Sequence, residues 1–334
     1  MLKEMQILSL IHIYLFAIDQ LGVMTQVNRL IALRYETELI KPGSFITFSV
    51  PMGAVNADCI RLQLMDPQTG TLCFSGRLYR RKAVWSGGFW QEELTAAGYD
   101  AGLTENQVQP QQRQNLTSAQ LYSEFVAPYM RTSANDLPAG QIASIEITRG
   151  MTAWGVVDTF CRQVYQKIPK LTRDGHLTVD WDTGNTHTIG NQPASAHPYA
   201  ALSFLDDRTS LLSVVYGQRQ DDDGFPYSMV SDLTPSYGLM RSRYVKISPA
   251  WAGQPVLAVQ ERMLNAQIDS YELEITLPEL LWAEPGDQVT LDDPIASFDD
   301  YYVSKVRVSF SPSGAQTVLQ CWSSERLSVP SALL

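Results

Sequence analysis

The sequence has few charged residues and none of the motifs that mark common catalytic sites. Charged side chains make up 18% of the 334 residues, below the roughly one quarter that is usual for globular proteins. Nucleophile elbows, Walker loops, dinucleotide-binding glycine patterns and zinc-protease motifs are all absent from the sequence. A low charge fraction with many tyrosines, tryptophans and glutamines has two interpretations. Either much of the surface is buried against other chains, or it is polar without being charged.

Basic residues are fewer than acidic ones. There are 25 lysines and arginines against 35 aspartates and glutamates, which gives a net charge of −10, and the longest basic run is Arg80-Arg81-Lys82. A protein that holds nucleic acid usually presents a basic patch that neutralises phosphates. The charge therefore argues against a dedicated nucleic-acid binder, while it is compatible with a conduit through which DNA passes without being held.

Cysteine is scarce, with four residues and no Cys-x-x-Cys pair. Cys59, Cys73 and Cys321 fall in predicted strands, and Cys161 falls in a predicted helix. We therefore expect small buried hydrophobic side chains in a reducing compartment. A disulfide between Cys59 and Cys73 is the alternative.

The first two dozen residues differ in composition from the rest of the chain. Residues 7–18 are mostly apolar, but the run is too short to span a bilayer, and Glu4 spoils the basic region of a signal peptide. Three interpretations are open. The segment is an apolar arm that docks on a neighbour, an additional strand of the first barrel, or an extension upstream of a natural start at Met24, which we favour. No membrane anchor is expected.

Residues 284–322 carry the clearest strand pattern. Pro285-Gly286-Asp287 predicts a turn in which Gly286 has a positive φ and the aspartate accepts a backbone N–H. Apolar side chains alternate with polar ones over residues 306–310, which is the period of a strand. Residues 311–314 have the length and composition of a hairpin loop. The pattern predicts a small antiparallel barrel or sandwich.

Residues 26–108 also have an all-β pattern. Ile60, Leu62 and Leu64 alternate with polar residues, as in a half-buried strand, and Gly76 indicates a bulge or a close backbone approach. The predicted strands are 30–35, 44–50, 59–65 and 72–78, with a turn at 66–70.

The middle of the chain combines helices with short strands. Thr117 and Gln120 fit a capping box that opens a helix over residues 117–129. Thr152 is the expected N-cap of a second helix. Asp174-Gly175 predicts a hairpin turn between two short strands. These patterns indicate a small α/β unit.

Strand patterns return after a polar connection over residues 185–198. Residues 202–217 are expected to open a second barrel. Residues 255–268 have the apolar stripe of an amphipathic helix, and residues 271–277 alternate as a strand that leads toward the Pro285 turn.

The order and spacing of these motifs, over most of residues 26–322, resemble those of phage tail hub proteins. These are the baseplate hubs of Mu-like phages and the late-control D protein family. The motifs that carry the resemblance are a Pro-Gly-Asp-x-Val turn at 285–289, a Gly-Thr-Leu-x-Phe-x-Gly-x-Leu strand at 70–78, a helix at 152–161 with Trp154 and Phe160-Cys161, and Ser-x-Val-Tyr-Gly at 213–217.

The resemblance implies a mainly β fold with an α+β insertion, in which two related small antiparallel β-barrels flank a small α/β domain. The expected divisions are residues 1–25 as the N-terminal arm or extension, 26–110 as the first β-barrel domain, 111–198 as the small α/β middle domain, and 199–334 as the second β-barrel domain with one helix.

The resemblance also implies a structural, non-enzymatic role in a virion. Three copies would form a ring around the tail channel and join the hexameric tail tube to the trimeric spike at the tail tip or baseplate. The implied partners are the chain itself as a homotrimer, the tail tube or distal tail protein, the central spike, the tape-measure protein and the baseplate wedge proteins, with DNA only in passage. Assembly would take place in the host bacterial cytoplasm.

No catalytic, cofactor-binding or metal-ligating residue is predicted, although three groups of side chains have the composition of a site. His187 and His197 flank a polar connection and could meet. Asp221-Asp222-Asp223 offers the hard oxygen ligands that calcium takes. Asp292-Asp293 and Asp299-Asp300 could flank a metal or a wall-degrading site.

Two functions from other classes remain as alternatives. A cell-wall-degrading hydrolase associated with a tail would need carboxylates that converge in a cleft. A carbohydrate-binding module would need exposed aromatic side chains on a concave face, and Trp85 and Trp90 are the candidates.

Overall fold

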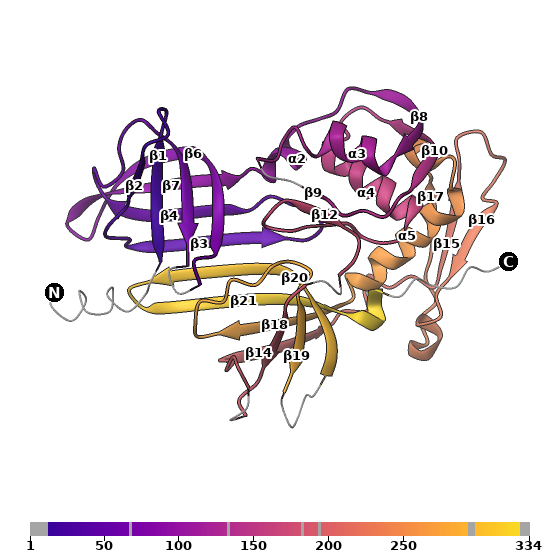
Figure 1. Cartoon of the computed structure of the whole chain (residues 1–334). Coiled ribbons are helices and arrows are strands. Elements are labelled where there is room, and N and C mark those ends of the chain that lie inside the picture. Colours follow the sequence, from indigo (N-terminus) through magenta and orange to yellow (C-terminus); the bar gives the residue numbers. More distant parts are fainter. Residues whose placement is uncertain are drawn as a thin grey trace.

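The computed structural model describes residues 13–66, 69–131, 134–181, 184–192, 195–292 and 298–327. The fold is mainly antiparallel β-sheet, with a helical segment set beside a large sheet (Figure 1). The predicted fold class is confirmed. Among the described residues, no helix is long and apolar enough to cross a membrane.

Thirteen of the described strands form the large sheet. Eleven follow one another in the order β14-β18-β21-β20-β3-β4-β7-β6-β5-β1-β2, while β13 pairs with β19 and β19 with β20. Their bounds are β1 (Tyr14–Asp19), β2 (Met24–Gln26), β3 (Ala32–Glu38), β4 (Phe45–Pro51), β5 (Cys59–Met65), β6 (Leu72–Ser86), β7 (Phe89–Gly98), β13 (Thr186–Ile189), β14 (Ala201–Asp206), β18 (Tyr271–Leu277), β19 (Gln288–Leu291), β20 (Phe298–Ser311) and β21 (Gly314–Ser323).

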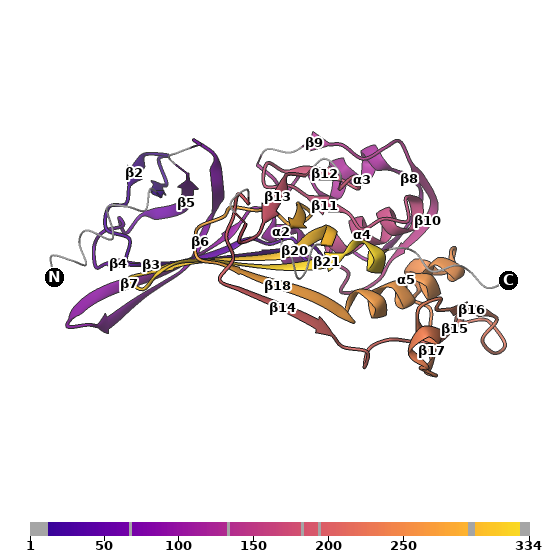
Figure 2. The same ribbon diagram turned by 90° about the horizontal axis from the view of Figure 1, so that it is seen from below.

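The strands expected to make two separate barrels lie in one continuous sheet. β20 pairs antiparallel with β3, with Val308 opposite Tyr35 and Phe310 opposite Leu33. The strand order is an open path, so the described strands do not close into a barrel. Figure 2 shows this sheet nearly edge-on, running from the β6–β7 hairpin to β18 and β14. The positions at which the chain divides into domains stay predictions.

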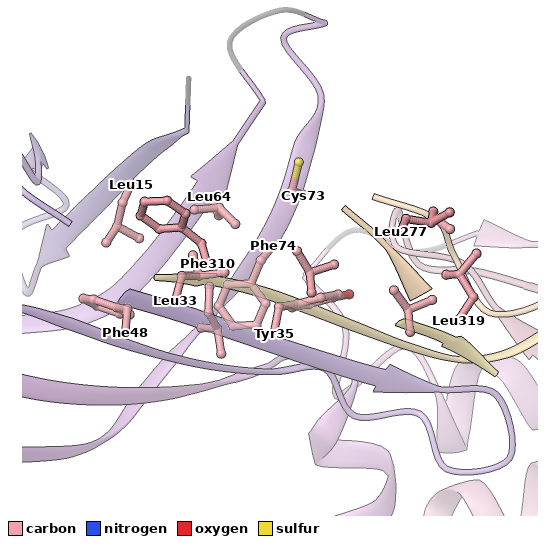
Figure 3. Close-up of a cluster of buried hydrophobic side chains, with 14 of the residues drawn as sticks. Leu15, Leu33, Tyr35, Phe48, Leu64, Cys73, Phe74, Leu277, Phe310 and Leu319 are labelled. Atoms are coloured by element: carbon pink, nitrogen blue, oxygen red, sulfur yellow. The ribbon is translucent and has the colours of Figure 1, made fainter. Parts of the chain in front are cut away.

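One hydrophobic core joins strands from both ends of the chain. Leu15, Phe48 and Phe74 from the first part lie in the same buried cluster as Phe310 and Leu319 from the last part (Figure 3). Apolar side chains of β3, β4 and β20 alternate along each strand and all point to this side of the sheet, which leaves the opposite side polar. The first and last parts of the chain therefore share a core.

The middle of the chain forms its own core. It contains α2 (Ala101–Glu105), β8 (Gln111–Thr117), α3 (Ser118–Phe125), β9 (Ala134–Asn135), β10 (Gln141–Ile147), α4 (Ala153–Val164), β11 (Lys170–Leu171) and β12 (His176–Thr178). The capping box of Thr117 and Gln120 and the Thr152 N-cap are confirmed. The first helix ends at Phe125 rather than Tyr129, because Pro128 disfavours helical geometry at the residue before it.

Residues 202–217 divide between two sheets rather than opening one barrel. β14 lies at the edge of the large sheet, and β15 (Val214–Gln218) pairs with β16 (Tyr227–Val230) and β17 (Ser242–Lys246) in a separate sheet. This sheet packs on α5 (Pro255–Ile268), the predicted amphipathic helix. The remaining elements are short 3₁₀ turns, η1 (Thr234–Tyr237), η2 (Pro249–Trp251) and η3 (Ser324–Leu327).

The apolar segment near the N-terminus contributes a strand. β1 pairs with β2 and β5, and Leu15, Ala17 and Ile18 are buried. This is the arrangement expected under the additional-strand interpretation, and it places Met24 inside the paired β2. Residues 1–12 lie outside the described residues.

The four cysteines are buried and free, as predicted, so the alternative of a Cys59–Cys73 disulfide is wrong. Burial raises the pKa of the Cys73 thiol to about 11 and holds that of Cys321 well above its ordinary value. The thiols therefore stay protonated and unreactive at neutral pH.

Candidate functional site

The predicted turn at Pro285-Gly286-Asp287 has the geometry expected from its sequence. Gly286 has a φ of +87°, in the region that favours glycine. The Asp287 side chain accepts the backbone N–H of Glu284, with 2.8 Å between N and Oδ2. The turn opens β19, which pairs with β13 and with β20. The predicted turn geometry is therefore confirmed.

Asp287 also holds groups from distant parts of the chain. It is only 1% exposed, and its Oδ1 accepts the backbone N–H of Asn185 at 3.1 Å. His187 Nε2 lies 3.0 Å from Oδ2, and Lys170 Nζ lies 3.8 Å from Oδ1. Burial opposes ionisation, but the hydrogen bonds from His187 and Glu284 and the charge of Lys170 outweigh it and lower the pKa of Asp287.

This arrangement suits a structural junction better than a catalytic one. A general base needs a free lone pair within reach of a substrate proton. The oxygens of Asp287 are already occupied by two backbone N–H groups, His187 and the nearby Lys170. A carboxylate with a lowered pKa that is buried in this way stabilises its charged form and accepts protons poorly. Asp287 therefore joins the turn to β13 and to the strand that holds Lys170.

A cavity of about 340 Å³ lies beside this junction, between the large sheet and the middle of the chain. Arg173 is its most buried cation, with an Nη2 that donates to the carbonyl of Trp282 at 2.9 Å. The Arg173 backbone N–H donates to Glu284 Oε2 at 2.8 Å, and its Nε lies 3.8 Å from Glu284 Oε1. These contacts fasten the β11–β12 hairpin to the segment that precedes the turn.

Tyr35 and Asp100 are two other ionisable groups of the cavity wall, and burial raises the pKa of both. Burial raises the pKa of the Tyr35 hydroxyl well above its ordinary value, despite the nearby Arg173 charge. Burial also raises the pKa of Asp100, whose oxygens accept hydrogen bonds from Ser44 N at 2.9 Å and Ser44 Oγ at 3.0 Å. Asp100 thereby ties the end of β7 to the start of β4.

The structure brings His187 and His197 together, with ring centroids 5.9 Å apart. Each ring contacts its own carboxylate: His187 contacts Asp287, and His197 Nδ1 lies 2.7 Å from Glu279 Oε1. The two histidines therefore lie close together, as their positions on either side of the polar connection suggested. Each is paired with a carboxylate from the chain that follows β18.

The acidic runs at 221–223 and 292–293 lie in different parts of the fold and contact different partners. Asp222 pairs with Arg219 at 2.8 Å, within the turn between β15 and β16, and Asp292 accepts a hydrogen bond from Ser195 Oγ at 3.0 Å. Asp293 lies outside the described residues, and only the backbone is described at Asp299 and Asp300. In the part of the chain that the structure describes, no group of three His, Cys, Asp or Glu side chains could hold a metal ion.

Trp85 and Trp90 face each other across the β6–β7 hairpin. Their rings make an edge-to-face contact with centroids 5.6 Å apart, and both side chains are more than half exposed. They lie next to the Gly87-Gly88 turn, at the projecting end of the hairpin (Figure 2). Flat stacking on a sugar in a concave site is not the arrangement of this pair.

Sequence reasoning missed Lys170, which contacts Asp287, and Arg173, which contacts the preceding Glu284. Both sit beside the predicted Asp174-Gly175 hairpin, and nothing in their local sequence indicates contacts with residues more than a hundred positions away. A buried lysine at 2% exposure needs a charged partner, but only the fold shows which one.

This chain resembles known proteins in structure rather than in sequence. No protein-family model and no curated protein sequence matches it. Among solved structures, it is similar to a tail protein from Neisseria meningitidis MC58, with a TM-score of 0.72, 15% identity, and coverage of 94% of this chain and 97% of that chain. It is also similar to the 43 kDa tail protein of prophage MuSo2 from Shewanella oneidensis, with a TM-score of 0.70, 12% identity, and coverage of 96% and 99%.

A third similar structure is a type VI secretion system component of Escherichia coli, described as structurally similar to the T4 phage tail proteins gp27 and gp5. The TM-score is 0.57 and the identity 12%, with coverage of 91% of this chain and 76% of that chain. At these identities the likeness concerns the fold. The predicted resemblance is confirmed at that level: over at least 91% of its length, this chain has the fold of phage tail proteins.

Proposed function

We propose that this chain is a non-enzymatic structural hub of a phage tail, baseplate or related injection machine. Three copies form a ring that surrounds the tail channel and joins the hexameric tail tube to the trimeric spike. The observation that carries the proposal is the similarity to two tail proteins over at least 94% of this chain and 97% of theirs. A likeness over whole chains favours a shared mode of assembly more than a likeness over one sheet would.

The proposed partners follow from the same role. Besides further copies of itself, the chain contacts the tail tube or distal tail protein, the central spike, the tape-measure protein and the baseplate wedge proteins. DNA only passes through the ring, which agrees with the net charge of −10. The protein resides at the tail tip or baseplate of the virion, after assembly in the host bacterial cytoplasm.

The experiment that tests the ring is a mass measurement on the purified full chain. Light scattering coupled to size-exclusion chromatography should give three times the chain mass of 37.3 kDa, and negative-stain microscopy should give rings with a central channel. A monomer at micromolar concentration, both alone and with its tail partners present, would contradict the proposal.

The non-enzymatic role has its own test. We expect a suspension of purified peptidoglycan to keep its turbidity with the full chain present. A loss of turbidity that disappears in the Asp222→Ala variant would instead support the wall-degrading alternative. Asp222 is chosen because it lies in the acidic turn and belongs to none of the buried hydrophobic clusters of the described residues.

A further inference from the structure

Three arginine side chains line one hollow beside the small sheet formed by β15, β16 and β17. The hollow has a volume of about 370 Å³, and Arg241, Arg243 and Arg262 all contribute to its wall. All three residues are exposed. Figure 2 shows these strands and α5 at one end of the molecule, away from the β6–β7 hairpin. Positive charge is therefore concentrated here, in a chain whose net charge is −10.

Strand geometry places Arg243 on the side of the small sheet that faces α5. β17 runs parallel to β15, with Arg243 opposite Val215 and Tyr244 opposite Tyr216. Val215 is buried in the core that the small sheet shares with α5, and side chains along a strand alternate between its two faces. Arg243 therefore lies on the same side as Arg262 of α5, while the two tyrosine rings stack on the other side, with centroids 4.9 Å apart.

Arg241 is held in place by main-chain groups. Its Nη1 donates to the carbonyl oxygens of Arg208 at 2.7 Å and Thr209 at 2.6 Å. Its backbone N–H donates to Ser213 Oγ at 2.9 Å. A guanidinium has five N–H donors, so the donors on Nε and Nη2 are left for other acceptors. Because carbonyl groups carry no net charge, these bonds orient the Arg241 guanidinium without neutralising it.

Nearby carboxylates do not balance the charge of the hollow. Among the described residues, neither Arg243 nor Arg262 takes part in an ion pair. Glu261, the neighbour of Arg262 in sequence, lies 3.7 Å from Arg162 instead. Of the described residues that line the hollow, only Asp269 carries a carboxylate, so three positive charges and one negative charge leave the wall with a net charge of +2. A bound anion would reduce the repulsion between these like charges.

The donors of the hollow suit carboxylate groups. The planar fork of a guanidinium matches the two oxygens of a carboxylate, and the hydroxyl groups of Thr209 and Ser242 also belong to the wall. Three guanidinium groups spread over one hollow favour a ligand with more than one carboxylate. Nucleic acid fits less well, since its dense phosphate charge would meet both Asp269 and the negative charge of the whole chain.

An exposed apolar side chain beside the arginines indicates that the ligand belongs to a protein. Met240 immediately precedes Arg241 and is 95% exposed. Methionine and arginine are both enriched at protein–protein interfaces relative to the rest of the surface. A protein segment would cover Met240 as well as pair with the arginines, whereas a small anion would leave that side chain in water.

From these features we infer that the hollow binds an acidic segment of a partner protein, with its carboxylates on Arg241, Arg243 and Arg262. The inference goes beyond the proposed role as a hub, because every wall of the hollow comes from a single copy of the chain. The site therefore stands whether or not copies form a ring. In a tail, the acidic segment would belong to one of the proteins that the hub contacts.

A synthetic acidic peptide tests the inference on the full chain. Fluorescence anisotropy follows the binding of labelled hexaglutamate, with labelled hexaglutamine as the neutral peptide control. We expect saturable binding of hexaglutamate alone, one peptide per chain, which weakens as added salt screens the exposed charges. The chain as a whole is acidic, so its net charge would repel hexaglutamate and cannot account for such binding.

Two double variants locate the site. Arg243→Ala/Arg262→Ala should weaken the binding of hexaglutamate about tenfold or more, since hydrogen bonds to charged groups are lost. Arg80→Ala/Lys82→Ala removes the same number of positive charges from exposed positions of β6 and should bind as the unchanged chain does. Circular dichroism melting checks that each variant is folded.

Asp269→Asn should strengthen the binding of hexaglutamate several-fold. The change removes the negative charge that lines the hollow. Asp269 is the C-cap of α5, where a negative charge opposes the helix dipole, so the change should not destabilise that helix. Damage to the fold would weaken binding rather than strengthen it, which makes this variant a test that misfolding cannot imitate.

Each contrary result overturns the inference. These results are the absence of saturable binding up to about 1 mM hexaglutamate, equal loss of binding in the two double variants, and unchanged or weaker binding in Asp269→Asn. Competition by inorganic phosphate or by a thymidine oligonucleotide that is as effective as that by unlabelled hexaglutamate would replace the acidic segment with a general anion or with nucleic acid. A trimeric chain that does not bind hexaglutamate overturns this inference alone, and a monomeric chain that binds it overturns only the ring.

Discussion

His187 and Asp287 lie one hundred positions apart in the sequence and meet with 3.0 Å between Nε2 and Oδ2. The contact fixes β13 against the turn that opens β19, and the two strands run parallel with Thr186 opposite Gln288. Parallel neighbours need a long connection, and here that connection includes β14 to β18. Asp287 therefore links β19, in the last part of the chain, to β13, which lies about one hundred positions earlier.

Replacing Asp287 by alanine should destabilise the protein strongly. The change leaves the buried Lys170, at 2% exposure, without its carboxylate, and it removes hydrogen bonds to the backbone N–H groups of Glu284 and Asn185. Removing one partner of a buried ion pair costs about 3 kcal/mol or more, above the roughly 1 kcal/mol of a single turn hydrogen bond. Urea unfolding measures the loss, and a change below about 1 kcal/mol would contradict this account.

Gly286 should be sensitive for two separate reasons. Its φ of +87° disfavours a side chain, and an added Cβ would lie 2.6 Å from Cδ of Lys170. Gly224 is the matched control, because its φ is +80° and a Cβ there would meet nothing within 4 Å. Gly224→Ala should cost about 1 kcal/mol for backbone strain alone. Gly286→Ala should cost clearly more, and equal melting temperatures for the two variants would show that the Lys170 contact is unimportant.

Asp287 should also contribute to the acid limit of stability. Its folded-state pKa is lowered below the ordinary 3.8, so its contribution is fully present above the unfolded-state pKa near 4. That contribution is lost as the pH falls through the lower folded-state value, because the unfolded chain then binds the proton first. The difference in urea midpoint between the unchanged chain and Asp287→Asn should therefore shrink as the pH falls below about 4. A constant difference over that range would refute the linkage.

Trp154 connects the middle of the chain to the first strands. Its Nε1 donates to the backbone carbonyl of Ile40 at 2.7 Å, and the side chain is buried. Trp154→Phe keeps most of the apolar contact but leaves that carbonyl without its donor, which should cost about 1–3 kcal/mol. The measurement is the urea midpoint of the full chain, and an unchanged midpoint would mean that solvent replaces the indole.

Local features of this fold could be predicted from the sequence because short-range chemistry determines them. The positive φ of Gly286, the Thr117 capping box and the loop over residues 311–314 each depend on neighbours within a few positions. The pairing of β20 with β3 joins Val308 to Tyr35 across most of the chain. Periodicity shows that each strand has an apolar side, but many strands here share that pattern, so it does not identify the partner.

The candidate site follows the same division. The hydrogen bond from Glu284 to Asp287 spans three positions, and the turn sequence predicts it. Lys170 and His187 reach Asp287 only because β11 and β13 are brought beside the turn by the fold. The composition of the acidic run at 221–223 suggested a calcium site, but it did not show that Asp222 pairs with Arg219, three positions away.

The shared core predicts that the first and last parts of the chain unfold together. Phe310 of β20 is buried and lies opposite Leu33 of β3, so Phe310→Ala should cost about 3–5 kcal/mol. Because β3 and β20 belong to one sheet, the loss should weaken both of its sides. Hydrogen exchange should show lower protection in β4 and in β18, which lie on opposite sides of that pair.

Phe160→Ala is the control, since Phe160 is fully buried in the separate core of the middle segment. It should cost a similar amount and reduce protection mainly in β8 and β10, because α4 packs against β10 and β8 pairs with it. If Phe310→Ala lowers protection in β18 while leaving β4 unchanged, the last part of the chain is stable independently. The continuous sheet would then be two units that touch, rather than one cooperative structure.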